Sequence, residues 1–427
     1  MKSLSEWLSW QETLHPEEIE LGLERIRRVA ARMEVLHHPQ ARVVTVAGTN
    51  GKGSSIAMLD AIARSAGLSV GVYTSPHLLR YNERIVVNGE PVTDQMLCQL
   101  FEQVDRARKE ERLTYFEFGT LAALALFQQQ PLELIILEVG LGGRLDAVNI
   151  IDADVALLTT VDLDHQSWLG ENRDAIGREK AGIFRSGKAA VVGEPSPPDT
   201  VLQRAEALKT VLYRLGVDFR YQRAEQYWCW QGGDGLTLDS LPLPALGGAI
   251  QLQNGAAILE VIVQLGWMER IGSEAIRQGL HSVTLAGRFQ QRNDHPQLIL
   301  DVAHNPQAAR QLAENLISTP VAGETIAVVG MLRDKERESV VAELSPEVDR
   351  WMVAGLEGNR GCTTAEMEKV VKLVADEATV ECFDTIIEAY RAALRGVSPA
   401  GRILVFGSFI TVAAVMALLE PSDGESE

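Results

Sequence analysis

Apolar, β-branched runs alternate with amphipathic helical patterns along most of the chain, the order expected of an α/β protein built on parallel strands. The clearest case starts with the apolar run at residues 43–47, which breaks into glycines around Lys52 and resumes as a helical stripe over residues 56–63. The stripe ends at Gly67, and a second apolar run follows at residues 70–73. This stretch therefore predicts a β-α-β unit.

Two more apolar runs extend the predicted sheet. Residues 134–137 are entirely apolar and end at Glu138, and residues 155–161 form another apolar, strand-like run. Before them, residues 114–119 open a helix that we predict over residues 120–128.

The remaining patterns in the first part of the chain are weaker. They predict helices over residues 17–33 and 200–215, a further helix that starts at Asn254, and β structure in the aromatic, glycine-rich residues 227–238. Gly22 lies near the start of the first helix, where an internal glycine lowers helix stability and can admit a ligand.

A second alternation of strands and helices begins near residue 298. Its short apolar strands are expected at residues 298–302, 325–329, 350–353 and 403–406. This pattern predicts a smaller, Rossmann-like doubly wound domain. We therefore divide the chain into a first domain (1–286), a linker (287–297) and a C-terminal domain (298–427) whose acidic tail, residues 420–427, is expected to be disordered.

No pattern in the chain predicts export or membrane insertion. Trp7 and Trp10 lie among charged residues, which fits an amphipathic helix rather than a secretory signal. The long uncharged run at residues 403–419 is divided by Gly407 into a strand and a helix, so it is not a membrane span. The cysteines are far apart and should be reduced thiols of a cytoplasmic protein: Cys98, Cys229, Cys362 and Cys382.

The glycine-rich loop around Lys52 has the features of a phosphate-binding loop. Its glycines let backbone N–H groups approach an anion, a helix beginning near Ser54 offers its positive end, and Lys52 adds a full charge. The spacing differs from the common phosphate-loop motif, because residue 46 is valine and Gly53 separates Lys52 from Ser54. The alternative is a glycine-rich turn that binds nothing, but the strand before it and the helix after it favour a phosphate site.

Composition limits the partners of such a site. The 427 residues are 46% hydrophobic and 23% charged, which is typical of a globular enzyme with more than one core. The formal net charge of −18 argues against nucleic acid and anionic membranes as partners. Phosphates therefore require local positive charge, for which the candidates are Lys52, Arg80, Arg84, Arg144, Arg178, Arg185 and Arg288.

Three further polar residues, Ser75, Glu138 and His165, each follow a predicted parallel strand. Parallel strands place their carboxyl ends at one edge of a sheet, so the three side chains should meet beside the phosphate loop. A hydroxyl and a carboxylate suit Mg²⁺, whereas His165 leaves Mn²⁺ or a water-bridged histidine open. Taken singly, each of these residue types more often has a structural role, but their joint placement beside Lys52 favours a metal site.

The loop and these residues lie within longer motifs that resemble the folate branch of the Mur ligase superfamily, the bifunctional folylpolyglutamate and dihydrofolate synthases. The resemblance covers nearly the whole chain. Its motifs are Gly48-Thr-Asn-Gly-Lys-Gly-Ser54, Tyr73-Thr-Ser-Pro-His-Leu78, Leu137-Glu-Val-Gly-Leu-Gly-Gly-Arg-Leu-Asp146, Asp164-His165, Arg178-Glu-Lys-Ala-Gly-Ile-Phe184, Gly287-Arg-Phe289 and Asp301-Val-Ala-His-Asn-Pro306.

The resemblance implies a phosphate-loop-containing Mur-ligase-type central domain and ATP-dependent amide formation. The carboxylate of dihydropteroate, or of the terminal glutamate of a tetrahydrofolate, would take the γ-phosphate of ATP, and the amine of L-glutamate would attack the acyl phosphate. Phosphoryl transfer requires positioning and charge neutralisation more than a protein nucleophile, which agrees with a phosphate loop and metal. The family further implies a monomer.

The resemblance also implies the residues of each subsite. Those for ATP are Thr49, Asn50, Gly51, Lys52, Gly53, Ser54, Asn254, Arg288 and Asp301. Those for the pterin are Glu20, Leu21, Gly22, Leu23, Thr114, Tyr115, Phe116, Glu117, Leu145, Asp146 and Ala147. Those for magnesium, expected as two ions, are Ser54, Ser75, Glu138, His165 and Lys180.

Some of these residues also fit simpler roles. Tyr115 and Phe116 could equally be core residues, Asp146 could cap a turn, and Arg288 could be an ordinary linker arginine. We expect Arg288 to stabilise charge on the transferred phosphoryl group, and His304 to lie on the glutamate or phosphate side of the second domain.

Lys180 is expected to act as an N-carboxylated lysine rather than as a cation, because the matching lysine of the family carries a carbamate. Desolvation and nearby positive charge lower the pKa of a lysine, so more neutral amine can react with carbon dioxide. The resulting anion could ligate a second Mg²⁺. The alternative is a helix-surface lysine that pairs with Glu179 or Asp174.

Two other functions remain open at this point. One is a Mur-type ligase that adds an amino acid to a cell-wall precursor, although the Gly-Lys-Gly-Ser variant of the loop and Asp164-His165 argue against it. The other is a nucleotide-binding regulator that hydrolyses ATP without ligation. The sequence also leaves open the γ or α linkage, the polyglutamate length, the one-carbon form of the folate and the extent of domain closure.

Overall fold

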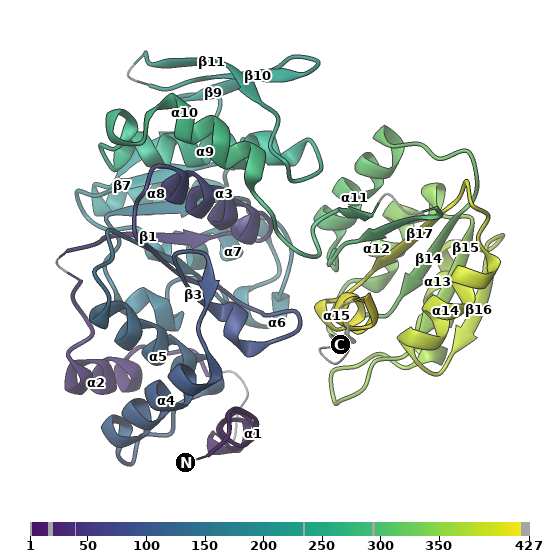
Figure 1. Cartoon of the computed structure of the whole chain (residues 1–427), viewed down its shortest axis with the longest axis horizontal. Helices are drawn as coiled ribbons and strands as arrows, with labels where there is room; N and C mark the ends of the chain where they lie inside the picture. The colour runs from purple at the N-terminus through teal and green to yellow at the C-terminus, as the bar shows by residue number, and fades with distance from the viewer. Residues whose placement is uncertain (1, 16–19, 39, 234, 293–294, 420–427) are drawn as a thin grey trace, which may run out of the picture. The chain divides into compact units, whose positions relative to one another are not determined.

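The computed structural model describes residues 2–15, 20–38, 40–233, 235–292 and 295–419, which form two compact units. Unit 1 contains the residues up to Asp162 together with Leu169–Ala245 and Gln251–Val283. Unit 2 contains Leu163–Trp168, Leu246–Ile250 and the residues from Thr284 onward. Each unit has its own sheet (Figure 1).

Unit 1 is built on an eight-stranded sheet with the order β4-β3-β2-β5-β1-β6-β7-β8. The six strands from β2 to the edge strand β8 are parallel, and β2 pairs antiparallel with β3. The strands are β1 (Arg42–Ala47), β2 (Val70–Tyr73), β3 (Ile85–Val87), β4 (Glu90–Pro91), β5 (Leu134–Glu138), β6 (Val155–Leu158), β7 (Ala189–Val192) and β8 (Val211–Arg214).

Helices cover both faces of this sheet, as the apolar strands require. Figure 1 shows α3, α9 and α10 on one side and α4 and α5 on the other. The helices are α1 (Leu4–Leu14), α2 (Glu24–Met33), α3 (Lys52–Ser65), α4 (Asp94–Arg108), α5 (Tyr115–Gln129), α7 (Arg173–Lys180), α8 (Asp199–Leu208), α9 (Ile250–Gln264) and α10 (Met268–Ser282), with 3₁₀ turns η1 (Tyr81–Arg84), η2 (Ala147–Ile150) and η3 (Ala181–Ile183).

A small antiparallel sheet lies beside α9 in unit 1. Its strands are β9 (Arg220–Arg223), β10 (Tyr227–Gln231) and β11 (Thr237–Pro242), in the order β11-β10-β9. Trp228 and Trp230 of β10 are buried, and the Trp230 indole N–H donates to the Ala256 carbonyl of α9 at 3.1 Å. Burial of these two rings therefore anchors the small sheet to the helix, and the predicted β structure is confirmed.

Unit 2 is a doubly wound domain on a six-stranded sheet with the order β12-β13-β17-β14-β15-β16. Apart from β12 its strands are parallel, and one face packs on α11, α12 and α13. The elements are β12 (Gln290–Arg292), β13 (Gln297–Leu300), β14 (Thr325–Val329), β15 (Arg350–Ala354), β16 (Thr379–Phe383), β17 (Arg402–Phe406), α6 (Gln166–Leu169), α11 (Pro306–Ser318), α12 (Arg337–Leu344), η4 (Ser345–Glu347), α13 (Thr364–Val374), α14 (Ile386–Gly396) and α15 (Phe409–Leu419).

Three predicted elements are wrong in part. Residues 20–23 are not helical and α2 begins at Glu24, while residues 16–19 and the tail at 420–427 lie outside the described residues. The helix predicted over 200–215 ends at Leu208, because Lys209 adopts a left-handed conformation, and β8 follows. The strand predicted over 155–161 ends at Leu158.

Two helices begin earlier than predicted, α5 at Tyr115 and α9 at Ile250. The predicted division of residues 403–419 is confirmed, with β17 before Gly407 and α15 after it. Within the described ranges, no helix combines the length and apolar character that a membrane crossing requires.

Candidate active site

The phosphate loop lies between β1, which ends at Ala47, and α3, which begins at Lys52. Gly51 has φ of 86° and ψ of −10°, a left-handed conformation that favours glycine. A Cβ atom on Gly48 would lie 1.8 Å from the Thr159 hydroxyl oxygen, and one on Gly51 would lie 2.7 Å from Asn254 Oδ1. The glycines therefore allow the chain to turn tightly against its neighbours. Asn254 lies beside the loop, and its role in ATP binding stays a prediction.

Two threonines beyond β6 hold the loop in place. The Thr49 N–H donates to the Thr160 carbonyl at 2.8 Å, and the Asn50 N–H donates to the Thr160 hydroxyl at 3.0 Å. The Thr159 hydroxyl donates to the Asn50 carbonyl at 2.7 Å. Beyond Leu158 the Thr159 N–H still donates to the Ala47 carbonyl of β1 at 2.9 Å, but the Thr160 carbonyl and the hydroxyls of both threonines bond to the loop, and β6 ends earlier than predicted.

Two lysines converge on one carbonyl of the loop. Lys52 Nζ donates to the carbonyls of Gly48 at 3.1 Å and Thr49 at 3.3 Å. Lys180 Nζ, at the end of α7, donates to the same Gly48 carbonyl at 3.0 Å, and Lys180 is only 5% exposed. Lys180 is thus not a surface lysine, and its side chain belongs to the phosphate loop.

Ser75 and Glu138 lie together at the carboxyl ends of β2 and β5. The Ser75 N–H donates to Glu138 Oε2 at 3.0 Å, Glu138 is buried, and it is the register partner of Val46 on β1. Ser54 is buried in the first turn of α3. The predicted clustering of Ser75 and Glu138 beside the phosphate-loop strand is confirmed.

These oxygen donors fit a magnesium ion. A buried carboxylate with serine hydroxyls nearby in the fold is the oxygen-rich donor set that Mg²⁺ prefers. Among the described residues no group of three or more His, Cys, Asp and Glu side chains is placed to hold a metal, so a site here would need hydroxyls, water or substrate oxygens as well. His165 belongs to unit 2, where its Nε2 lies 3.5 Å from Lys335 Nζ, and its role as a metal ligand stays a prediction.

An arginine connects several of the predicted pterin residues. Arg25 Nε donates to both oxygens of buried Glu117, at 2.8 and 3.0 Å, and Arg25 Nη1 lies 2.6 Å from Glu20 Oε1. Glu117 also accepts the Thr114 N–H at 2.8 Å in the capping box of α5. Glu117 therefore has a structural role, and Arg25, which sequence reasoning did not assign, holds Glu20 and Glu117 together.

The other predicted pterin residues beside Glu20 and Glu117 are half-buried or buried. Leu21, Gly22 and Leu23 precede α2 and are partly exposed, and a Cβ on Gly22 would meet no atom within 4 Å. The Phe116 ring stacks on the buried Tyr73 ring with centroids 5.8 Å apart, and Phe116 and Tyr115 are both half-buried. Leu145 is half-buried and Ala147 is buried.

Asp146 is a buried carboxyl that caps η2. Its oxygens accept the N–H groups of Leu141 at 2.8 Å and Val148 at 3.1 Å. Burial raises the pKa of Asp146 to about 7, although these hydrogen bonds and the charge of Lys52 act to lower it. The alternative role of Asp146 as a cap is present, and its pterin contact stays a prediction. Near neutral pH the carboxyl can either donate or accept a hydrogen bond.

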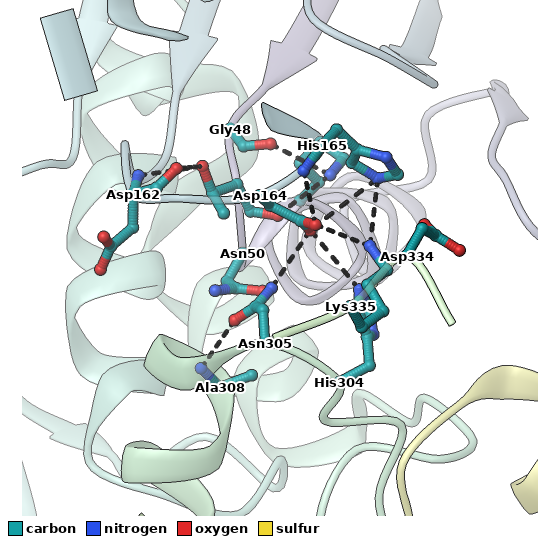
Figure 2. A network of polar contacts seen from close by, with 12 residues as sticks. Gly48, Asn50, Asp162, Asp164, His165, His304, Asn305, Ala308, Asp334 and Lys335 are labelled. Atoms are coloured by element: carbon teal, nitrogen blue, oxygen red, sulfur yellow. Dashed lines mark hydrogen bonds and ion pairs between the residues drawn. The ribbon is translucent and has the colours of Figure 1, made fainter. Parts of the chain in front are cut away.

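Unit 2 contains a second polar cluster, centred on Asp164 (Figure 2). Lys335 Nζ donates to Asp164 Oδ1 at 2.6 Å, Asn305 Nδ2 donates to Oδ2 at 3.3 Å, and His304 Nε2 lies 3.6 Å from Oδ2. Burial alone would raise the pKa of Asp164, but the hydrogen bond from His304 and the charge of Lys335 hold it well below its usual range. Sequence reasoning did not assign Asp164, Asn305 or Lys335 a role, although Asp164 and Asn305 stood in the quoted motifs.

Arg288 and Asp301 also lie in unit 2. Asp301 accepts the N–H groups of Phe289 and Ala303, each at 2.7 Å, and burial raises its pKa while the charge of Arg288 acts to lower it. The Arg288 guanidinium lies 5.1 Å from the centroid of the Phe409 ring. The structure thus brings Arg288, Asp301 and His304 into one unit.

Comparisons with known proteins agree with these two units. Residues 46–218 match the Mur ligase middle domain, and residues 287–409 match the Mur ligase glutamate ligase domain. The chain is 45% identical over 417 residues to the dihydrofolate synthase/folylpolyglutamate synthase of Escherichia coli, covering 98% of this chain and 96% of that protein. It is 40% identical to the Haemophilus influenzae enzyme of the same name, with 98% of each chain covered.

Solved structures give the same result. The E. coli FolC structure in complex with DHPP and ADP has a TM-score of 0.93 and 45% identity, with 98% of each chain covered. A structure of bifunctional folylpolyglutamate synthase/dihydrofolate synthase with Mn, AMPPNP and L-glutamate bound has a TM-score of 0.91 and 45% identity, again with 98% of each chain covered. The Yersinia pestis enzyme complexed with AMPPNP and Mn ion has a TM-score of 0.91 and 46% identity.

Proposed function

The chain belongs to the dihydrofolate synthase/folylpolyglutamate synthase family of Mur ligases, which use ATP to join glutamate to folates, and we propose that its phosphate loop activates two carboxylate substrates in turn. These substrates are dihydropteroate, which becomes dihydrofolate, and tetrahydrofolate, which becomes a folylpolyglutamate. The observation that supports a single site is the arrangement of Lys52, Lys180, Ser75 and Glu138 around one phosphate-loop strand.

The loop residues bind the phosphates of ATP. Residues 49–54 offer backbone N–H groups, the N-terminus of α3 and the Lys52 ammonium group, and Asn254 contacts the loop at Gly51. A carboxylate oxygen of the substrate attacks the γ-phosphorus, and the bond to the bridging oxygen of ADP breaks. Lys52 compensates the negative charge that moves toward ADP in this step.

Ser54, Ser75, Glu138 and His165 would hold Mg²⁺, and carbamylated Lys180 would hold a second ion. When bound, such ions neutralise phosphate charge and orient the reacting oxygens. Mn ions accompany AMPPNP in related structures, so Mn²⁺ is the second candidate. In this proposal the protein supplies oxygen donors from Ser75 and Glu138 at the carboxyl ends of β2 and β5.

The second half of the reaction joins glutamate. The amine of L-glutamate attacks the carbonyl carbon of the acyl phosphate, loses a proton, and phosphate leaves as the amide forms. We place Arg288 and Asp301 at the nucleotide, with Arg288 stabilising charge on the phosphoryl group, and we place His304 on the glutamate side. We base this placement on unit 2, in which these residues lie together with the buried ion pair of Asp164 and Lys335.

We further propose that the protein acts as a monomer in the cytoplasm. In the described part of the chain all four cysteines are free thiols, which agrees with a reducing compartment.

Competition between the two carboxylate substrates tests this proposal. Because the chain has one phosphate loop and one set of candidate metal ligands, dihydropteroate should inhibit glutamate ligation to tetrahydrofolate competitively, with an inhibition constant close to its own KM. The measurement is initial-rate kinetics with radiolabelled glutamate. Independent turnover of both substrates at saturation would require a second pterin pocket and would contradict the proposal.

A further inference from the structure

Arg84 is one of the arginines expected near the site that have no carboxylate ion pair in the described part of the chain. It is half-buried at the end of η1. Three of the other arginines form ion pairs with carboxylates: Arg80 with Asp94, Arg144 with Glu179 and Arg185 with Asp152. Burying a guanidinium costs more free energy without an anion beside it than with one, and a bound ligand can supply that anion.

The Arg84 guanidinium is held in a fixed orientation. Its Nε donates to His77 Nδ1 at 2.8 Å, and its Cζ lies 5.2 Å from the centroid of the Tyr81 ring and 5.4 Å from that of Tyr115. Because Arg84 Nε is the donor of this hydrogen bond, His77 Nδ1 is its acceptor, and the bond fixes the plane of the guanidinium. Nε is bound to His77, and the guanidinium lies near the Tyr81 and Tyr115 rings. The two terminal Nη groups then form a pair of donors that can bind a carboxylate.

The loop that carries Arg84 is itself rigidly built. The carboxylate of Glu83 accepts the N–H groups of Leu78 at 2.7 Å, Leu79 at 2.8 Å and Arg80 at 2.6 Å. Glu83 is therefore committed to the backbone and is not available to neutralise its neighbour Arg84. The acid next to Arg84 in the sequence thus stabilises the backbone of its own loop.

Arg84 also lies beside the carboxyl end of β2, close to Ser75 in the fold. Its carbonyl accepts the Thr74 N–H at 2.9 Å, which places it beside the residue that precedes Ser75. The next residue, Ile85, begins β3 and pairs with Tyr73 at the end of β2. Tyr115, which packs against the guanidinium, is one of the predicted pterin residues. Arg84 is thus adjacent to the candidate metal ligand on one side and to the pterin region on the other.

We infer that Arg84 binds the α-carboxylate of the glutamate already attached to a folate substrate, and so distinguishes folates from dihydropteroate. This inference rests on the proposed function. A tetrahydrofolate carries two carboxylates, of which the γ-carboxylate reacts and the α-carboxylate stays charged throughout. Dihydropteroate carries one carboxylate, on its benzoate ring, and that one reacts. A cation beside the pterin region but outside the phosphate loop matches the non-reacting group.

Two other roles for Arg84 make different predictions. If Arg84 bound the reacting carboxylate, its loss would slow both ligations equally, because both substrates carry that group. If Arg84 only fastened the loop through His77 and the tyrosines, its loss would lower thermal stability and would not depend on the α-carboxylate of the substrate.

The test compares Arg84→Ala with the wild-type protein on three substrates: dihydropteroate, tetrahydrofolate and the α-carboxamide of tetrahydrofolate. In the variant, KM for tetrahydrofolate should rise about 10- to 100-fold with kcat little changed, the range expected for hydrogen bonds to a charged group. KM for dihydropteroate should change by less than about threefold. The wild type should prefer the carboxylate over the carboxamide by a similar 10- to 100-fold, and Arg84→Ala should lose that preference.

Two further variants complete the experiment. Arg84→Lys keeps the charge without the planar fork and should restore part of the affinity for tetrahydrofolate. Arg106→Ala, which removes an arginine of α4 whose side chain is 77% exposed and paired with Glu102, should behave as wild type. The dihydropteroate reaction, measured on the same preparations, shows whether each variant is folded.

Equal losses with dihydropteroate and tetrahydrofolate would overturn the inference, and so would an undiminished preference for the carboxylate in Arg84→Ala. Failure of the wild-type protein to ligate glutamate to either substrate would instead overturn the proposed function, and the role of Arg84 with it.

Discussion

Replacing Lys52 with alanine is expected to lower kcat for both carboxylate substrates by at least about 10³-fold, the scale on which cations act in phosphoryl transfer. Lys52 opens α3 and lies folded over the loop, where its Nζ contacts the Gly48 and Thr49 carbonyls. No other charged side chain lies within residues 48–55 of the loop. Thermal unfolding should change little, since the bonds lost are to two carbonyls of the same loop. The measurement is the steady-state rate together with the melting temperature.

Lys188→Ala is the matched control for this variant. Lys188 is a lysine of unit 1 whose side chain is 49% exposed and pairs with Asp154 at 3.0 Å, so its removal should leave the rate unchanged. Wild-type activity in Lys52→Ala would show that the loop does not bind the transferred phosphate.

The second large effect is expected at Lys180. Its Nζ and that of Lys52 both lie within hydrogen-bond distance of the Gly48 carbonyl, at 3.0 and 3.1 Å, and two ammonium groups so placed repel each other. Conversion of Lys180 to a carbamate replaces this repulsion by attraction and supplies two oxygen ligands. We therefore expect Lys180→Ala to lose at least about 100-fold in kcat, the scale for removing one preorganised electrostatic group.

Chemical rescue distinguishes a carbamate from a structural lysine. Short carboxylic acids should restore part of the activity of Lys180→Ala by occupying the place of the carbamate, and should not rescue Lys52→Ala. Wild-type protein equilibrated with ¹³C-bicarbonate should show a carbamate carbon signal that Lys180→Ala lacks. Full activity of unmodified wild-type protein in carbon-dioxide-free buffer would exclude the carbamate.

The features that the sequence predicted well depend on local pattern. The phosphate loop, the strand that ends at Glu138 and the division at Gly407 follow from runs of apolar residues and from glycines whose neighbours are close in the chain. The clustering of Ser75 with Glu138 followed from one topological rule, that parallel strands end at the same edge. Such rules require no knowledge of individual side-chain contacts.

The features that the sequence did not predict depend on long-range pairs. Arg25 meets Glu117 across 92 positions, and Lys335 meets Asp164 across 171 positions. No local pattern indicates which acid an arginine or lysine will reach in the folded chain. The same limit applies to Arg84, since its lack of a carboxylate partner among the described residues can be recognised only once its surroundings are known.

The wrong helix boundaries have local causes that periodicity does not detect. Apolar spacing continues past Leu208 into Val211, but Lys209 adopts the left-handed conformation that ends α8, and the β-branched and aromatic residues that follow join the sheet as β8. Near the N-terminus, α2 starts only after Gly22, because glycine is a weak helix former.

The central claim is that this site makes an acyl phosphate from the carboxylate substrate. The most direct measurement uses dihydropteroate whose carboxylate is labelled with ¹⁸O, together with ATP and L-glutamate. In an acyl phosphate one carboxylate oxygen bridges carbon and phosphorus and leaves with the phosphate, so the account predicts one ¹⁸O atom in phosphate for each amide formed. Release of unlabelled phosphate alongside the amide would contradict it.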